Sequence, residues 1–374
     1  MKIKIADKTY TYTQPVALTE IAAEIKEENC LAAKVNGRLR ELSYIITKDS
    51  TVSFLKYTHP DAIRIYESTL RYIIAKAIKN LYPKAKVRFN YSISRSILGV
   101  FESFDGVLDA SVVEEINKEV QSIIDQDIKI ARKRISIGEA TKMYTEFGML
   151  DKVAILKYRD EDYVNLYECD GYINYMFGYM LPSTGYIKSY KLFLYHPGFI
   201  IQYPRAEFSG QIPPFSDEPR FGMALKEAAK WGRVIHGNTI PLINEYAKDF
   251  ASSVDFVNMC ETKHSHMLYE LGTQIQNNME TIRLIAIAGP SSSGKTTFSN
   301  RLRIELMSRG IMPVMISIDD YYLNKKFAPK NEDGSPDLEH VDALDVEQFN
   351  SDMLSLIQGQ EVVLPKFNFQ TGTR

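Results

Sequence analysis

The sequence predicts a multidomain protein in which α+β units are followed by the start of an α/β domain. Its first 57 residues alternate short strand patterns with one helical pattern, which is typical of a small α+β unit. From residue 283, an apolar run, a glycine-containing turn and a helical pattern follow one another, as at the start of an α/β domain. A length of 374 residues corresponds to about two to three domains. We place them at 1–58, 59–205 and 281–374, with a proline-rich linker and helical connector over 206–280.

Composition and charge exclude several classes of protein. The chain is 45% apolar and 25% charged, which argues against disorder, and it has no apolar run of the roughly 18 residues that a membrane span needs. The charged and alternating N-terminus does not resemble a secretory signal, and the three cysteines form no C-x-x-C, so we expect a cytoplasmic protein without membrane contact. The net charge is −2 and no segment is strongly basic, so charge gives RNA contact by the front domains no support while leaving it open. The oligomeric state is left undetermined.

The first 58 residues predict a β-grasp fold. Lys2–Ile5 and Tyr10–Thr13 alternate like a hairpin, and Ala17–Glu27 has apolar residues at helical spacing. Asn36-Gly37 predicts a tight turn between two short strands, because both residue types tolerate positive φ. Thr51–Leu55 is expected to be the last strand.

The next two hundred residues predict a mixed domain and then a helical connector. Their helical patterns have one apolar face, and their strand patterns are rich in tyrosine, phenylalanine and isoleucine. The prolines at 204–220 predict a surface loop. The expected helices are 61–82, 111–128, 137–147 and much of 221–280, and the expected strands lie within 85–107 and 152–203.

A phosphate-binding loop is predicted where an expected strand at 283–288 meets an expected helix at 298–308. Residues 289–296 read GPSSSGKT and match G-x-x-x-x-G-K-[ST] at every fixed position. Glycines allow backbone N–H groups to curl around a phosphate, and the helix N-terminus adds positive charge. Lys295 is expected to reach the β- and γ-phosphates of ATP, and Thr296 to hold Mg²⁺. The expected nucleotide-binding residues are Gly289, Pro290, Ser291, Ser292, Ser293, Gly294, Lys295, Thr296 and Thr297.

A carboxylate follows a second expected buried strand at 314–318. Asp319 then lies at the edge of the sheet where open α/β domains bind ligands. A hydroxyl that accepts a phosphoryl group needs a carboxylate to align it and take its proton. An N-cap or a magnesium-supporting role is the alternative for Asp319, and we expect such a role for Asp320.

Four segments in order resemble the uridine kinase/phosphoribulokinase branch of P-loop kinases. They are the loop, Ser317–Tyr322, Leu338–Asp345, and Pro365–Phe369 with Arg374, all within 281–374. The resemblance implies that Asp319 and Lys295 are catalytic and that the substrate is a nucleoside 5′-hydroxyl. It also implies that substrate contacts come from Tyr322, Glu339, His340, Asp342, Phe367 and Arg374. Simple packing is the alternative for the two aromatics, and a solvated loop for the acidic segment.

The chain departs from that family at several positions. Glu339 stands where the family has Asp, Val341 where it has Pro, and Phe367 lacks the family tyrosine's hydroxyl. Gly372 replaces a base-contacting histidine, so the base preference stays open. Because the family has a further acidic strand and a lid beyond this point, we expect the sequence to be a fragment of a longer kinase. Two other functions are carried forward: a nucleotide sensor or RNA-binding protein without turnover, and a kinase for a sugar phosphate or pantothenate.

The front of the chain resembles threonyl-tRNA synthetases, with a TGS domain followed by the editing domain. Pro15–Leu18, Ala32–Gly37 and Leu181–Gly185 are among the segments that resemble them. The editing site of that family uses H-x-x-x-H and C-x-x-x-H, and this chain has Glu67 and Arg71, then Tyr175 and Tyr179, at those positions. We therefore predict an ion pair at the first two positions and no hydrolysis of aminoacyl-tRNA. The whole chain resembles a TGS-containing, uridine kinase-like nucleoside kinase.

Three further features have simple structural explanations. His264 and His266 are expected to lie on a helix surface, Cys169 to be a buried thiol, and Arg132–Arg134 to be a solvated face.

Overall fold

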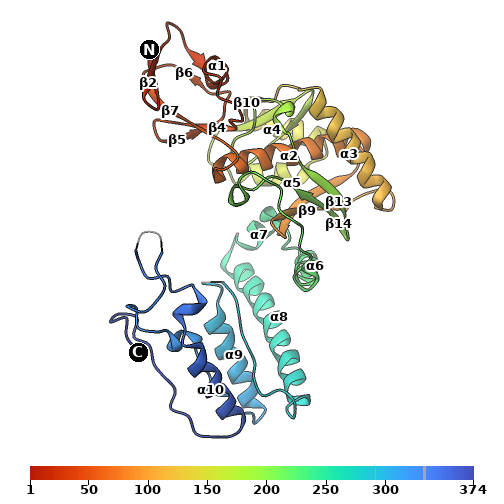
Figure 1. Ribbon diagram of the computed structural model, residues 1–374. Coiled ribbons are helices and arrows are strands. Elements are labelled where there is room, and N and C mark those ends of the chain that lie inside the picture. Colours follow the sequence, from red (N-terminus) through yellow and green to blue (C-terminus); the bar gives the residue numbers. More distant parts are fainter. Residues whose placement is uncertain (291, 332–333) are drawn as a thin grey trace. The chain divides into compact units, whose positions relative to one another are not determined.

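A computed structural model describes residues 1–290, 292–331 and 334–374 (Figure 1). Two compact units are present, Met1–Glu245 and Tyr246–Arg374. The architecture is mixed α+β with several small sheets. None of the described helices combines the length and apolar composition that crossing a bilayer requires. The domain boundaries proposed from the sequence stay predictions.

The first element of unit 1 is a five-stranded sheet in the order β2-β1-β7-β4-β5. Helix α1 (Leu18–Glu24) buries Leu18 and Ile21 in one core with Ile3 of β1. The predicted tight turn is confirmed, since Asn36 and Gly37 both have positive φ. The strands are β1 (Lys2–Ile5), β2 (Lys8–Thr11), β4 (Ala32–Val35), β5 (Arg38–Arg40) and β7 (Ser50–Leu55), with β3 (Val16–Ala17) pairing β6 (Ile45–Ile46).

Two long helices pack on a second, four-stranded sheet in the same unit (Figure 1). Helix α2 (Pro60–Leu81) begins at Pro60, whose missing N–H costs nothing at a helix start, and His59 caps it. Leu70 of α2, Ile116 of α3 and Phe199 of β14 share the core. The elements are α3 (Ala110–Asp125), β8 (Lys86–Ile93), β9 (Ser96–Ser103), β13 (Lys191–Tyr195) and β14 (Gly198–Gln202).

A three-stranded sheet and two short helices complete this part of unit 1. Ser136 and Glu139 form a capping box that starts α4. Helix α5 overlaps the start of the range 152–203, within which the sequence predicts strands, and its apolar residues pack with α4 around Tyr144. The elements are β10 (Ala131–Ser136), β11 (Tyr163–Cys169), β12 (Tyr172–Asn174), α4 (Ile137–Glu146) and α5 (Leu150–Leu156), with α6 (Pro219–Val234) and α7 (Ile240–Tyr246) following.

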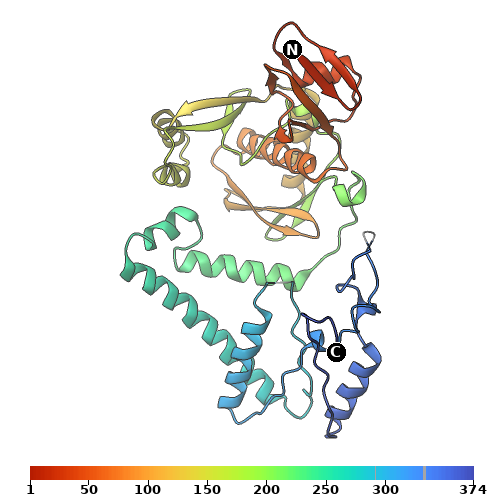
Figure 2. The same ribbon diagram turned by 90° about the vertical axis from the view of Figure 1, so that its left-hand side faces the viewer.

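Unit 2 is built around two helices that lie side by side, α8 (Phe250–Asn277) and α9 (Lys295–Ser308) (Figure 2). Leu268 and Ile275 of α8 meet Leu302 and Leu306 of α9 in a small buried core. Two 3₁₀ turns, η3 (Ile318–Tyr321) and η4 (Val341–Ala343), precede α10 (Val346–Ile357).

The buried strands predicted at 283–288 and 314–318 are wrong for this structure. Neither segment belongs to a strand, and the described part of unit 2 has only isolated bridges. Leu284 is 58% exposed and Val314 70% exposed, although both are strong strand formers by pattern. A continuous apolar run gives a buried strand only when neighbouring strands supply its hydrogen bonds, and here neither segment has such a neighbour.

Candidate active site

The loop before α9 has the backbone of a phosphate cradle. Helix α9 begins at Lys295, and its N-cap is Gly294 with a φ of +88°, so no side chain caps the first amides. Ser292 also has a positive φ. A Cβ on Gly289 would lie 2.8 Å from Ser293 Oγ, so the loop closes tightly only because Gly289 has no side chain. Uncapped N–H groups at a helix start bind anions well. Ser291 lies outside the described residues.

Lys295 places a positive charge on this cradle. Its Nζ donates to the carbonyl oxygens of Gly289 at 2.7 Å and Pro290 at 3.0 Å. These carbonyls hold the ammonium group of Lys295 close to the loop at which it is predicted to bind phosphate. No carboxylate pairs with Lys295 among the described residues, so its charge is not neutralised there.

The hydroxyl of Thr296 is exposed at the start of the same helix. No hydrogen bond occupies it in the part of the chain that the structure describes. Mg²⁺ prefers oxygen ligands and keeps several waters, so one hydroxyl beside phosphate oxygens fits it. The described residues contain no cluster of three or more acidic, histidine or cysteine side chains that would form a metal site by themselves. The residues thus fit a magnesium ion that arrives with the nucleotide.

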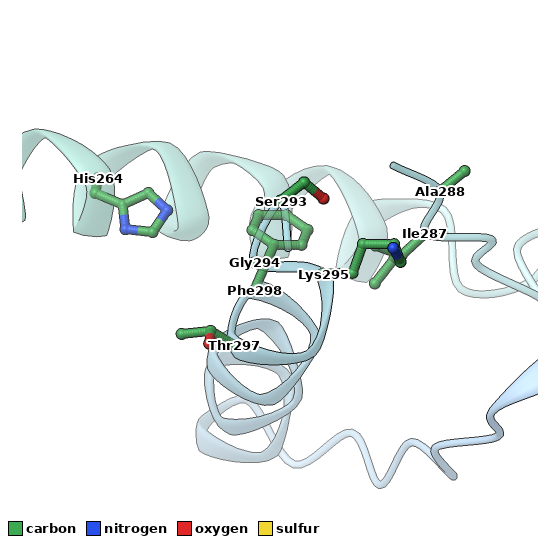
Figure 3. A pocket seen from close by; sticks show the side chains of 8 residues that line it. All are labelled: His264, Ile287, Ala288, Ser293, Gly294, Lys295, Thr297 and Phe298. Atoms are coloured by element: carbon green, nitrogen blue, oxygen red, sulfur yellow. The ribbon is translucent and has the colours of Figure 1, made fainter. Parts of the chain in front are cut away.

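A cavity of about 530 Å³ lies at this loop (Figure 3). Most of its lining comes from the loop and α9, but one residue, His264, comes from α8. Sequence reasoning missed His264, because its position at the loop depends on the packing of α8 against α9. The lining residues are His264, Ile287, Ala288, Ser293, Gly294, Lys295, Thr297 and Phe298.

The two neighbouring aspartates on η3 differ in their surroundings. Asp320 pairs with Lys366 Nζ at 3.1 Å and accepts a hydrogen bond from the backbone N–H of Phe367 at 3.3 Å. Asp319 is exposed, and its carboxylate has no hydrogen bond or ion pair among the described residues. Asp320 therefore joins two segments, while Asp319 is available to a ligand.

An aromatic cluster lies directly after Asp319. The rings of Tyr322 and Phe367 meet edge to face with centroids 5.6 Å apart, and Phe369 contacts both. Burial raises the pKa of Tyr322, and the nearby carboxylates of Asp319 and Glu339 raise it further. Tyr322 thus contacts Phe367 and lies near the carboxylates of Asp319 and Glu339, and substrate contact by these residues stays a prediction. Phe369, which is 52% exposed, is an addition that the sequence comparison did not single out.

The remaining predicted substrate residues form contacts within the domain. His340 Nδ1 accepts a hydrogen bond from the N–H of Asp342 at 3.1 Å and caps η4. Arg374 pairs with Asp345 at 3.0 Å and donates to Gln348 at 2.9 Å, both at the start of α10. Substrate contact by these three residues stays a prediction.

The structure does not place all of the predicted catalytic residues in one cavity. Lys295 and Thr297 line the cavity of about 530 Å³, and Asp319 is not among the residues that line it. Asp319 and the phosphate loop therefore do not share this cavity.

In the front unit, three of the four positions that correspond to an editing site, Glu67, Arg71 and Tyr179, are bonded within the unit. Glu67 and Arg71 form the predicted ion pair at 3.1 Å, and Glu67 also accepts from Tyr203 Oη at 3.2 Å. Tyr179 Oη accepts a hydrogen bond from Arg40 at 3.2 Å. Tyr175 is partly exposed. The absence of aminoacyl-tRNA hydrolysis stays a prediction.

Comparison with protein families identifies the C-terminal region. Residues 284–374 match the model of the Phosphoribulokinase / Uridine kinase family. The chain carries a domain of this family. This match contains the loop from Gly289 to Thr297, Asp319 and the aromatic cluster. Kinases with a P-loop use ATP, so the family supports ATP as the phosphate donor.

The front of the chain is similar to threonine–tRNA ligases. The protein of Symbiobacterium thermophilum is 30% identical over 185 residues, which are 48% of this chain and 28% of the relative. The proteins of Thermotoga petrophila and Listeria monocytogenes are 29% and 30% identical over 195 and 197 residues, or 51% of this chain and 30% and 31% of theirs. The chain thus spans about three tenths of the length of these relatives.

Proposed function

We propose that the C-terminal domain transfers the γ-phosphate of ATP to the 5′-hydroxyl of a nucleoside, with Mg²⁺. The observation that most supports this is that, among the described residues, the carboxylate of Asp319 and the hydroxyl of Thr296 have no partner, and no carboxylate neutralises Lys295. In a domain of a kinase family, a carboxylate without an ion pair is more simply explained by a role in ligand binding than by a role in stabilising the fold.

The phosphate loop would act on the donor. The first amides of α9 and Lys295 hold the β- and γ-phosphates and offset the charge that develops as the phosphoryl group moves. Thr296 would supply one oxygen ligand to Mg²⁺, which would help to offset the negative charge of the phosphates. Thr297 lines the same cavity and adds a hydroxyl near the phosphates.

Asp319 would act on the acceptor. Its carboxylate accepts the proton of the 5′-hydroxyl and aligns the oxygen with the γ-phosphorus. Tyr322 and Phe369 offer aromatic surface for a base, with the buried Phe367 packed against both, and Glu339 offers a carboxylate for the ribose hydroxyls. Since Asp319 does not line the phosphate cavity, transfer also requires the two parts to approach when substrates bind.

Phosphate transfer from labelled ATP to a panel of nucleosides tests this proposal. Sugar phosphates and pantothenate belong in the same panel, because they are the alternative acceptors. A labelled nucleoside monophosphate that disappears with Lys295→Ala supports the proposal and identifies the base. If only a sugar phosphate or pantothenate becomes labelled, the protein is a kinase for that acceptor and the nucleoside proposal is wrong.

A nucleotide-binding protein without turnover is the second candidate. The observation that favours it is the separation of Asp319 from the cavity that Lys295 lines. Under this alternative the chain binds ATP, every acceptor stays unlabelled, and Asp319→Asn has no consequence. Under the first, Asp319→Asn loses transfer and keeps ATP binding.

A further inference from the structure

His264 brings an imidazole from α8 to the phosphate loop. This residue lies outside the region that matches the kinase family, which begins at residue 284. It is half-buried, and it lines the same cavity as Gly294, Lys295 and Thr297 (Figure 3). His264 lies on the surface of α8, as expected, but on a side that lines the cavity at the phosphate loop, whereas His266 is exposed.

Arg301 on α9 fixes the proton of this imidazole. Its guanidinium approaches His264 Nδ1 at 2.8 Å and also holds Glu261 at 2.9 Å and Ser265 at 3.3 Å. Because a guanidinium can only donate, Nδ1 must accept. The neutral ring then carries its hydrogen on Nε2, which becomes a donor. Within the described residues no hydrogen bond uses that Nε2–H.

The cavity offers this donor one kind of ligand. Gly294, Lys295 and Thr297 surround the phosphate end of a bound nucleotide, not its base. No acidic side chain lines the cavity, while Lys295 adds positive charge to it. Phosphate oxygens, which only accept hydrogen bonds and are negatively charged, complement both groups.

We propose that His264 donates its Nε2–H to the polyphosphate chain of the nucleotide, so that α8 forms part of the ATP site. This proposal rests on the proposed function, because it requires that ATP bind at the loop. Under this proposal the nucleotide site contains residues from the kinase family domain and from helix α8, which precedes it. Arg301 is then a positioning residue, since it acts through His264.

Calorimetric titration with ATP·Mg tests the contact. A hydrogen bond to a charged acceptor is worth enough that His264→Ala should weaken ATP binding about tenfold or more. His264→Gln, whose amide N–H reaches close to the position of Nε2–H, should recover most of the affinity. His266→Ala is the matched control on the same helix and should bind ATP like the unaltered chain. Binding of adenosine, which has no phosphate, should not respond to any of the three.

A second measurement does not depend on a variant that folds. Nitrogen-15 NMR of the histidine rings in the unaltered chain should show the Nε2–H form for His264, and ATP should shift that signal while leaving His266 in place. His264→Gln assigns the signal. Unchanged affinity in His264→Ala, or a His264 ring that ATP does not shift, overturns the inference and leaves the proposed function intact. No ATP binding by the unaltered chain overturns both.

Discussion

Two regions of this chain resemble catalytic domains, and they differ in how their polar groups are bonded. At the kinase-like end, the carboxylate of Asp319 and the hydroxyl of Thr296 have no partner among the described residues, and no side chain caps the amides at the start of α9. In the synthetase-like front, Glu67 and Arg71 pair with each other and Tyr179 binds Arg40. The first arrangement leaves chemistry available for a ligand, whereas the second uses polar groups to hold the fold.

This difference has a physical basis. A polar group that folding has desolvated costs free energy unless it finds a partner, so a stable fold pairs its polar groups wherever function does not require them to be free. An ion pair and a tyrosine–arginine bond at the positions that correspond to an editing site hold together segments of the front unit. Resemblance of fold does not by itself imply resemblance of function, so the absence of deacylation stays a prediction for this unit.

The largest expected effect is the loss of turnover when Asp319, the proposed proton acceptor, is replaced. Asp319→Asn removes the proton acceptor and should lower turnover about 10²- to 10⁴-fold with ATP affinity unchanged. Asp320→Asn is the matched control, because Asp320 is bonded to Lys366 and should affect stability more than turnover. Turnover with a nucleoside and ATP measures both. Equal losses in the two variants would contradict the distinction between a free and a bonded aspartate.

The sequence predicted those elements whose residues interact mainly within one segment or hairpin. The apolar faces of α2 and α3 and the Asn36-Gly37 turn were predictable, because periodicity and turn chemistry are local. The segments 283–288 and 314–318 were not, since a strand depends on neighbours elsewhere in the chain. Residues of a functional site are subject to the same limit, because local sequence patterns do not reveal contacts with distant segments.

Among site residues, local signals found the loop and missed its surroundings. G-x-x-x-x-G-K-T is contiguous, so Lys295 and Thr296 were identified directly. The Glu67–Arg71 pair was predictable from its i, i+4 spacing. His264 and Phe369 take their roles from contacts with distant segments, and neither has a local pattern that would reveal them.

Removal of the buried Thr69 hydroxyl in the front unit should have the next largest effect, which is a loss of stability. Thr69 Oγ1 donates to Ile65 O at 2.8 Å and accepts from the N–H of Leu181 at 2.9 Å. Thr69→Val leaves that buried N–H without a partner and should reduce the free energy of unfolding by about 1–3 kcal/mol. Urea titration measures the change. Thr69→Ser keeps the hydroxyl and should lose clearly less, and an equal loss would show that the methyl group matters more than the hydrogen bond.

The ion pair at the former editing positions should contribute less, because both side chains are partly exposed. Glu67→Gln should cost about 1 kcal/mol of stability, and the double variant with Arg71→Gln should cost less than the sum of the two single variants. No variant of this pair should change phosphate transfer, and the unaltered chain should not deacylate mischarged tRNA. Additive losses would show that the two charges do not interact, and deacylation would show that the front unit has kept a catalytic function.

The smallest expected effect is on the reactivity of the Cys169 thiol, and it does not involve the stability of the fold at neutral pH. Burial raises the pKa of Cys169 to about 11, with nearby Asp170 and Glu168 adding to the shift and Lys76 opposing it. Only the thiolate reacts with iodoacetamide, so at pH 7.5 the half-buried Cys260 should be labelled and Cys169 should not. Labelling of Cys169 should increase as the pH rises toward 11, and unfolding in urea should expose it at any pH, as mass spectrometry of peptides would show. Rapid labelling of Cys169 in the folded chain at pH 7.5 would mean that the front unit also has a polar group available for chemistry, and the contrast between the two regions would then no longer hold.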